Sequence, residues 1–110
     1  MNIILIETPE FISKIDKIDS EESFTALQDE LTIDPYKGKV VKSTGGARKI
    51  RMKLHGSGKS GGARIIYYYV DLRGEIWFLD VYEKKNKTTL TDAENKKLLH
   101  FIKEVINAEE

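Results

Sequence analysis

The chain has 110 residues and a formal net charge of zero, and its length is enough for one domain with a modest core. Because it has no cysteine, disulfides and thiolate metal sites are excluded. Its longest apolar runs, Ile3–Ile6 and Ile65–Val70, are too short to cross a membrane, and its N-terminus lacks the features of a signal peptide. We therefore expect one cytoplasmic domain over residues 1–110, without a membrane-bound part.

The zero net charge conceals three blocks of different charge. Residues 1–36 hold nine acids and two bases, whereas residues 37–64 hold nine lysines and arginines and no acid. Residues 65–110 hold seven bases and nine acids. A stretch of nine cations without a carboxylate is typical of a surface that binds a polyanion, although charge runs are also common on plain solvated faces.

The acidic first block predicts a strand followed by two helices. Residues 1–7 form a short apolar run typical of a buried strand, and Pro9 suits the first turn of a helix. Asp19 and Glu22 are spaced as a capping box, which predicts the start of a second helix. Asp34-Pro35 ends that helix because the residue before a proline is disfavoured in helical conformation.

The basic block contains a strand with one charged face. In residues 47–54, ARKIRMKL, apolar residues alternate with Lys49, Arg51 and Lys53, which is the period of a half-buried strand. Three like charges on one strand face repel one another, so packing gives no reason to place them there. The alternation therefore indicates an anion-binding face.

The glycine-rich stretch GSGKS, at residues 56–60, looks like the end of a nucleotide-binding phosphate loop. Counting back from Gly58-Lys59-Ser60, the first glycine of that motif falls on Lys53. The residues that follow, 64–70, are β-branched and aromatic, which predicts a strand where the motif requires a helix. The stretch is therefore not predicted to bind ATP.

Two further strands and a helix complete the chain. Residues 64–70 and 75–82 read as a hairpin around the turn Asp71–Gly74, and a capping box at Thr91–Glu94 opens a final helix. The apolar stripe of that helix comprises Leu98, Phe101, Ile102 and Val105. The predicted class is α+β, with an N-terminal strand, a two-helix hairpin, a three-stranded antiparallel core and a C-terminal helix. We expect the helices on one sheet face and the cations on the other.

Three segments make the chain similar to a known family. They are Thr44–Arg51 (TGGARKIR), Gly58–Tyr68 (GKSGGARIIYY) and Tyr82–Asn86 (YEKKN) with Leu90-Thr91 after it. Together they resemble the RelE/ParE toxin superfamily, and within it the HigB-like toxins of type II toxin–antitoxin systems, over nearly the whole chain. The resemblance implies a RelE-like fold and a ribosome-dependent mRNA endoribonuclease, an mRNA interferase that cuts in the ribosomal A site and blocks translation. It also implies a cognate HigA-like helix-turn-helix antitoxin, and no cofactor or metal.

The resemblance also assigns residues to the reaction. In this superfamily the RNA 2′-hydroxyl attacks the adjacent phosphate, which requires a base, positive charge for the transition state and an acid for the leaving 5′-oxygen. The positions that match the family's basic residues are Lys49, Arg51, Arg64, Lys84 and Lys85. Arg64 is expected to clamp the phosphate through two oxygens, because an arginine does not deprotonate. A lysine flanked by other cations is expected to act as the base.

The remaining roles rest on weaker signals. Some family members carry a catalytic tyrosine near the C-terminal helix, and residues 87–91 have none, so Tyr82 or His55 is the candidate acid. Lys53, Lys59, Tyr68 and Lys85 are predicted to contact RNA. Two alternatives stay open, namely a ParE-like poison of DNA gyrase and a non-catalytic RNA- or ribosome-binding module.

Overall fold

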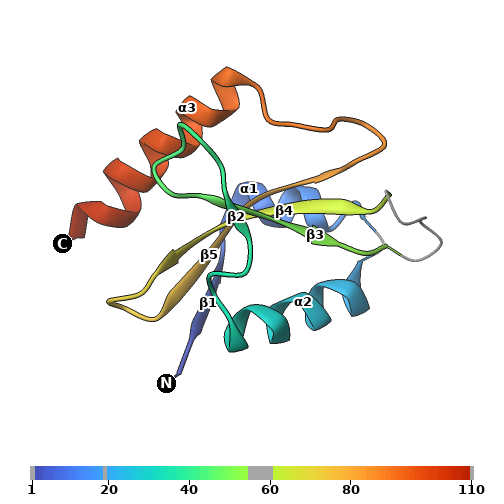
Figure 1. Ribbon diagram of the computed structural model, residues 1–110, viewed down its shortest axis with the longest axis horizontal. Coiled ribbons are helices and arrows are strands. Elements are labelled where there is room, and N and C mark those ends of the chain that lie inside the picture. Colours follow the sequence, from blue (N-terminus) through green and yellow to red (C-terminus); the bar gives the residue numbers. More distant parts are fainter. Residues whose placement is uncertain (1, 19, 55–60, 110) are drawn as a thin grey trace.

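The structure is a computed structural model that describes residues 2–18, 20–54 and 61–109. Within these residues one mixed sheet has the strand order β1-β5-β4-β3-β2 (Figure 1). Its strands are β1 (Ile4–Glu7), β2 (Lys39–Val40), β3 (Arg48–Met52), β4 (Ala63–Val70) and β5 (Glu75–Glu83). The α-helices of the described chain are α1 (Pro9–Ile15), α2 (Glu21–Ile33) and α3 (Asp92–Phe101). The predicted α+β class is confirmed, and the two-residue strand β2 is an addition to it.

The helix starts follow local hydrogen bonds. The Thr8 side chain accepts from the Phe11 N–H and donates to the Phe78 carbonyl, so it caps α1 and ties it to β5. The N-cap of α2 is Ser20, one residue after the predicted cap, and Asp19 lies outside the described residues. The capping box of α3 at Thr91 and Glu94 is present as predicted.

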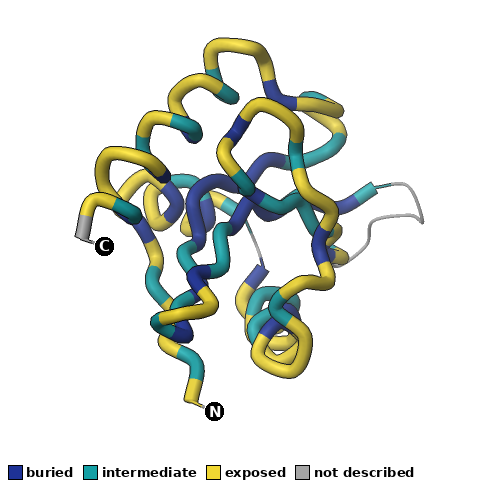
Figure 2. Tube along the Cα trace, turned by 60° about the vertical axis from the view of Figure 1, so that its left-hand side comes forward, coloured by how far each residue is buried: buried dark blue, intermediate teal, exposed yellow. Residues whose placement is uncertain are grey.

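The helices cover both faces of the sheet, contrary to the prediction that they share one. Phe11, Leu27 and Leu31 of α1 and α2 pack with Ile65, Tyr67 and Phe78 on one face. Leu98 and Ile102 at the C-terminal end pack with Ile66 and Tyr82 on the other. Because neighbouring residues of β4 belong to different clusters, the sheet separates two cores, and its strands β4 and β5 are rich in buried residues (Figure 2). The helix α3 therefore shares its face with the cations of β3.

The apolar stripe of the last helix also differs from the prediction. Ile106 is buried and Val105 is 47% exposed. Residues Ile102–Ile106 form a π-helical turn, in which the Asn107 N–H donates to the Ile102 carbonyl five residues earlier. Ile106, four residues after Ile102, therefore lies in the buried stripe in place of Val105. Within the described residues no helix is both long and apolar enough to span a bilayer.

A β-bulge in β5 changes which side chains face each core. Ile66 is opposite Asp80 and Tyr67 is opposite Phe78, so Leu79 is an extra residue in β5. Before the bulge Phe78 faces the core under α1 and α2, whereas after it Val81 does so and Tyr82 faces α3. The bulge thus turns Tyr82 toward the face that carries Arg64.

Asp80 holds the backbone at the bulge. Its Oδ1 accepts from the Val81 N–H at 2.9 Å and from the Lys14 Nζ at 2.7 Å. The residue is buried, and removing the carboxylate would leave a buried N–H without this acceptor. Burial by itself lowers the pKa of Lys14, but the hydrogen bond and charge of Asp80 outweigh it and raise that pKa.

We predict that Asp80→Ala lowers the free energy of unfolding by about 1–3 kcal/mol, because it leaves buried polar groups unsatisfied. Asp80→Asn keeps an oxygen for the Val81 N–H and is expected to cost less. Urea denaturation measures both, with the exposed Asp29→Ala as the control, which should stay within about 0.5 kcal/mol of wild type. Equal losses for Asp80→Ala and Asp29→Ala would contradict the role given to Asp80.

Candidate functional site

The sheet register places Arg51, Arg64 and Tyr82 in one row across three strands. Arg51 pairs with Arg64 in the β3–β4 ladder, and Arg64 pairs with Tyr82 in the β4–β5 ladder. Directly opposite residues of antiparallel strands project from the same face, about 4.5–5.5 Å apart at Cβ. Two arginines in such a pair repel each other, so this row is suited to binding an anion.

Lys49 lies in the next row of the same face. It pairs with Ile66 of β4 on one side and with Lys39 of β2 on the other. Lys39 is exposed and was not among the predicted site residues. Its only signal in the sequence is the short alternation Lys37-Gly38-Lys39-Val40, because β2 has two residues.

The hydroxyl of Tyr67 fixes the segment before β2. It accepts from the Gly38 N–H and donates to the Pro35 carbonyl, each at 2.8 Å. A Cβ on Gly38 would lie 2.8 Å from the Tyr67 ring, so only glycine fits there without displacement. This contact brings Lys39 beside Lys49.

The ends of β3 and β5 add two lysines on either side of Gly62. The Lys84 N–H donates to the Gly62 carbonyl at 2.8 Å, which extends the ladder past β5. A Cβ on Gly62 would lie 3.6 Å from the Lys53 Cα and 2.6 Å from the Met52 carbonyl oxygen. We call Lys49, Arg51, Lys53, Arg64 and Lys84 the basic patch.

The patch lies toward the end of β3 and the start of β4, and Figure 1 shows that this end of the two strands lies away from α3. Arg51 and Lys53 also line a groove of about 480 Å³ whose other wall is α2, with Glu22 and Glu30. Lys85 is exposed beside Lys84 and lies 3.9 Å from the Glu83 carboxylate. The predicted loop contact Lys59 and the alternative acid His55 lie outside the described residues.

Tyr82 is a buried member of its row, with 8% of its surface exposed. Its hydroxyl donates to the Thr88 carbonyl at 3.4 Å, and its ring packs with Leu90 and Ile66. Burial raises the pKa of the phenol above its ordinary value of 10, and the positive charge of Arg64 opposes that shift. The phenol therefore keeps its proton at neutral pH, and its ring offers little surface for stacking on a base.

Tyr68 shares the face of Arg64 but lies away from the patch. It is four residues along β4, or about 13 Å at the usual rise of a strand. It packs in the α3-side core, and its hydroxyl accepts from the Asn107 side chain at 3.3 Å. No cation of the basic patch therefore lies next to Tyr68 to support its predicted contact with RNA.

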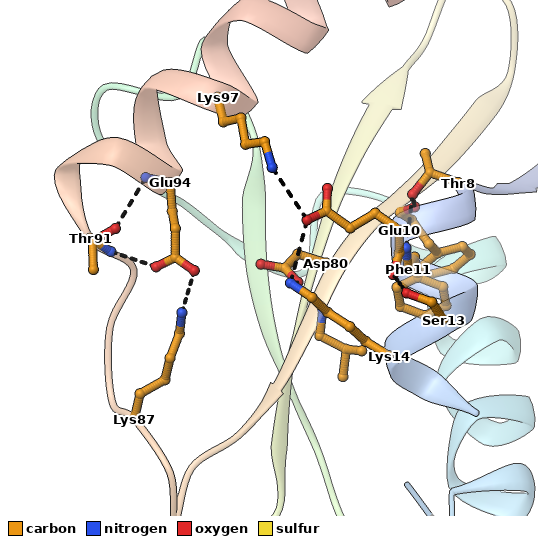
Figure 3. Close-up of polar contacts among 12 residues, drawn as sticks. Thr8, Glu10, Phe11, Ser13, Lys14, Asp80, Lys87, Thr91, Glu94 and Lys97 are labelled. Carbon is orange, nitrogen blue, oxygen red and sulfur yellow. Dashed lines mark hydrogen bonds and ion pairs between the residues drawn. The ribbon is translucent and has the colours of Figure 1, made fainter. Parts of the chain in front are cut away.

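Lys87 is a second cation that the sequence prediction left out. Its Nζ lies 5.2 Å from the centre of the Tyr82 ring, over the ring. The same Nζ forms an ion pair with Glu94 (Figure 3). The other oxygen of Glu94 accepts from the Thr91 N–H, and the Thr91 hydroxyl accepts from the Glu94 N–H at 3.1 Å. The hydrogen bond from Lys87 is the main cause of the lowered pKa of Glu94, and the Thr91 N–H adds to it.

A cavity of about 390 Å³ lies elsewhere, between α1 and α3 beside the bulge. It is lined by apolar residues such as Leu79, Leu98 and Phe101, and by the Lys14–Asp80 pair. The members of the basic patch do not line it. Among residues 2–18, 20–54 and 61–109, no three His, Asp or Glu side chains are grouped so that they could hold a metal ion.

Solved structures of bacterial toxins share this arrangement of strands and helices. The chain superimposes on a double arginine-to-alanine variant of the E. coli toxin RelE in the free state with a TM-score of 0.60 and 18% sequence identity, over 79% of this chain and 88% of the other. The chain has the RelE fold. It also matches the intact E. coli RelBE toxin–antitoxin complex, with a TM-score of 0.56 and 20% identity over 73% of this chain and 94% of that one. No protein-family model matches the sequence.

On this RelE fold, the basic patch supplies what a phosphate ligand requires. Arg64 carries a planar guanidinium, one nitrogen of which donates to the Ala63 carbonyl at 3.2 Å, and the lysines add positive charge. The patch lies on β3 and β4 and on the residues that follow β3 and β5, so most of its backbone is held by the sheet. A rigid row of cations is suited to stabilising a developing negative charge.

The pair of Glu94 and Lys87 predicts a pH dependence of stability. Folding lowers the pKa of Glu94 from 4.5. The contribution of Glu94 to the free energy of unfolding is therefore fully present above pH 4.5 and is lost as the pH falls through the lowered pKa. Unfolding measured from pH 7 downward should therefore show a smaller acid-induced loss in Glu94→Gln than in wild type. If the free energy of unfolding fell equally with pH in the two proteins, the stabilising role given to ionised Glu94 would be contradicted.

Proposed function

We propose that the chain is a HigB-like toxin of the RelE/ParE superfamily, a ribosome-dependent endoribonuclease that cuts mRNA in the A site. The observation that carries the proposal is the row of Arg51, Arg64 and Tyr82, with Lys49 in the next row, on a RelE fold. One of the similar proteins is a toxin and the other a toxin–antitoxin complex. Translating ribosomes would place its action in the cytoplasm.

In the proposed reaction the RNA 2′-oxygen attacks the neighbouring phosphorus, and the bond from phosphorus to the 5′-oxygen breaks. A lysine of the patch takes the proton of the 2′-hydroxyl, and Lys49 is placed for it on β3. Arg64 binds the non-bridging oxygens, with Arg51 and Lys84 adding positive charge. The proton for the leaving 5′-oxygen comes from Tyr82 or His55. The products are a 2′,3′-cyclic phosphate and a 5′-hydroxyl.

The proposed partners follow from the same surface. The ribosome supplies RNA phosphates for Lys53, Lys59 and Lys85, which would bind the backbone rather than the scissile group. A HigA-like helix-turn-helix antitoxin is the proposed inhibitor. The similarity to the toxin in the E. coli RelBE toxin–antitoxin complex supports a protein inhibitor, and the helix-turn-helix type rests on the resemblance of the sequence.

We predict that the wild-type protein shortens mRNA in a translation run-off assay and only on translating ribosomes. Arg64→Ala should reduce the cleavage rate by roughly a hundredfold or more, because it removes a contact made mainly in the transition state. The exposed Lys96→Ala on α3 is the control and should cleave as wild type does.

Three outcomes would decide against this function. Intact mRNA together with gyrase-dependent DNA breaks would favour the gyrase poison. Ribosome binding without cleavage would favour the non-catalytic module. Full activity of Arg64→Ala, at equal protein levels and equal thermal stability, would contradict the assigned phosphate clamp.

A further inference from the structure

The segment from Lys84 to Leu90 connects β5 to α3 and carries a lysine of the basic patch. Its first residues form a turn, in which the N–H groups of Asn86 and Lys87 donate to the Glu83 carbonyl at 3.0 and 3.4 Å. At the far end Leu90 is buried in the α3-side core. Between these ends Lys84 and Lys85 lie outside the strand ladder, apart from the Lys84 N–H bond to Gly62.

Lys87 makes polar contacts with both neighbouring elements, β5 and α3. Its ammonium group lies over the ring of Tyr82 in β5. The same group pairs with Glu94 in α3 (Figure 3). The side chains of Lys87 and Glu94 are 32% and 29% exposed, so this pair is screened less than one on the open surface. Glu94 is itself fixed by the capping box with Thr91.

We propose that Lys87 is a positioning residue for the basic patch, which holds the turn carrying Lys84 beside Arg64. Tyr82, the ring that Lys87 covers, is the cross-strand neighbour of Arg64. Loss of the Lys87 contacts would leave the segment held by backbone bonds to Gly62 and Glu83, by the Tyr82–Thr88 bond and by buried Leu90. No ion pair would then join the turn that carries Lys84 to α3. Small displacements of a catalytic group are costly, so the effect belongs to the chemical step.

A different role, as a further phosphate ligand, is less consistent with these contacts. The Lys87 ammonium already has a carboxylate partner, and a phosphate would have to displace Glu94 from it. That carboxylate is also bound to the first turn of α3. The phosphate role is therefore an alternative outcome of the test.

The test uses Lys87→Met, which keeps the length of the side chain without its charge, and Glu94→Gln, which keeps an oxygen for the Thr91 N–H. Lys87→Arg restores the charge, and Lys97→Met is the control because Lys97 is 76% exposed on α3 and pairs with Glu10 instead. Amide hydrogen exchange of the isolated proteins is expected to speed up at residues 84–88 in Lys87→Met and Glu94→Gln. It should stay unchanged in Lys87→Arg and Lys97→Met.

The inference rests on the proposed function only for its effect on rate. On saturating programmed ribosomes, Lys87→Met and Glu94→Gln should each slow single-turnover cleavage by about ten- to a hundredfold. Ribosome affinity and its salt dependence should stay at the wild-type values, and the double variant should be no slower than the slower single one. Lys87→Arg should cleave as wild type does.

Unchanged exchange at residues 84–88 in Lys87→Met would overturn the inference whether or not the protein is a nuclease. A weaker affinity with a reduced salt slope and an unchanged rate at saturation would make Lys87 a phosphate ligand and would also overturn it. Wild-type protein that leaves mRNA intact contradicts the proposed function instead. The exchange measurement, made without ribosomes, separates these two failures.

Discussion

The hydrogen bond from the Val81 N–H to the Asp80 carboxylate lies where β5 changes the faces of its side chains. In a regular strand without the bulge, Phe78 and Tyr82 would project from the same face, since they are four residues apart. With it, Phe78 stays in the core under α1 and α2, and Tyr82 faces α3. The alignment of Tyr82 with Arg64 depends on this bulge, and Asp80 and Lys14 hold it from the α1 side.

The position of α3 follows from the same feature. Tyr82 and Leu79 both contribute to the core that α3 covers, so the helix packs on the face that also carries the cations. The segment that joins β5 to α3 consequently runs beside the basic patch, and it brings Lys84 and Lys87 there. Like charges directly opposite each other, as in Arg51 and Arg64, cost stability in the free protein. A bound phosphate would remove that cost, which is a physical reason for the site to bind an anion.

Much of this could be predicted from the sequence. The alternation of Lys49, Arg51 and Lys53 placed three cations on one face of a strand, and the observed register keeps Lys49 and Arg51 on the face of Arg64. Capping signals located α3, and the aromatic run located β4, because both depend on short-range hydrogen bonds and strand propensity.

The rest depends on contacts between distant residues. Residues 75–83, EIWFLDVYE, have large side chains at both parities, so the pattern does not reveal where the strand changes face. The strand β2 is too short to show a period, and its position is set by the Tyr67 hydroxyl, 29 residues from Gly38. The role of Lys87 requires knowledge of the Tyr82 ring and the Glu94 carboxylate together.

The central claim is that the basic patch promotes attack of an RNA 2′-oxygen on the adjacent phosphate of ribosome-bound mRNA. The most direct measurement is the chemistry of the new RNA ends, mapped by end-specific ligation and sequencing after translation with the purified protein. The proposed reaction should yield 5′-hydroxyl ends paired with 2′,3′-cyclic phosphates, confined to translated regions and aligned with the ribosomal A site. New ends that carry 5′-phosphates, or that occur equally on RNA without ribosomes, would contradict it.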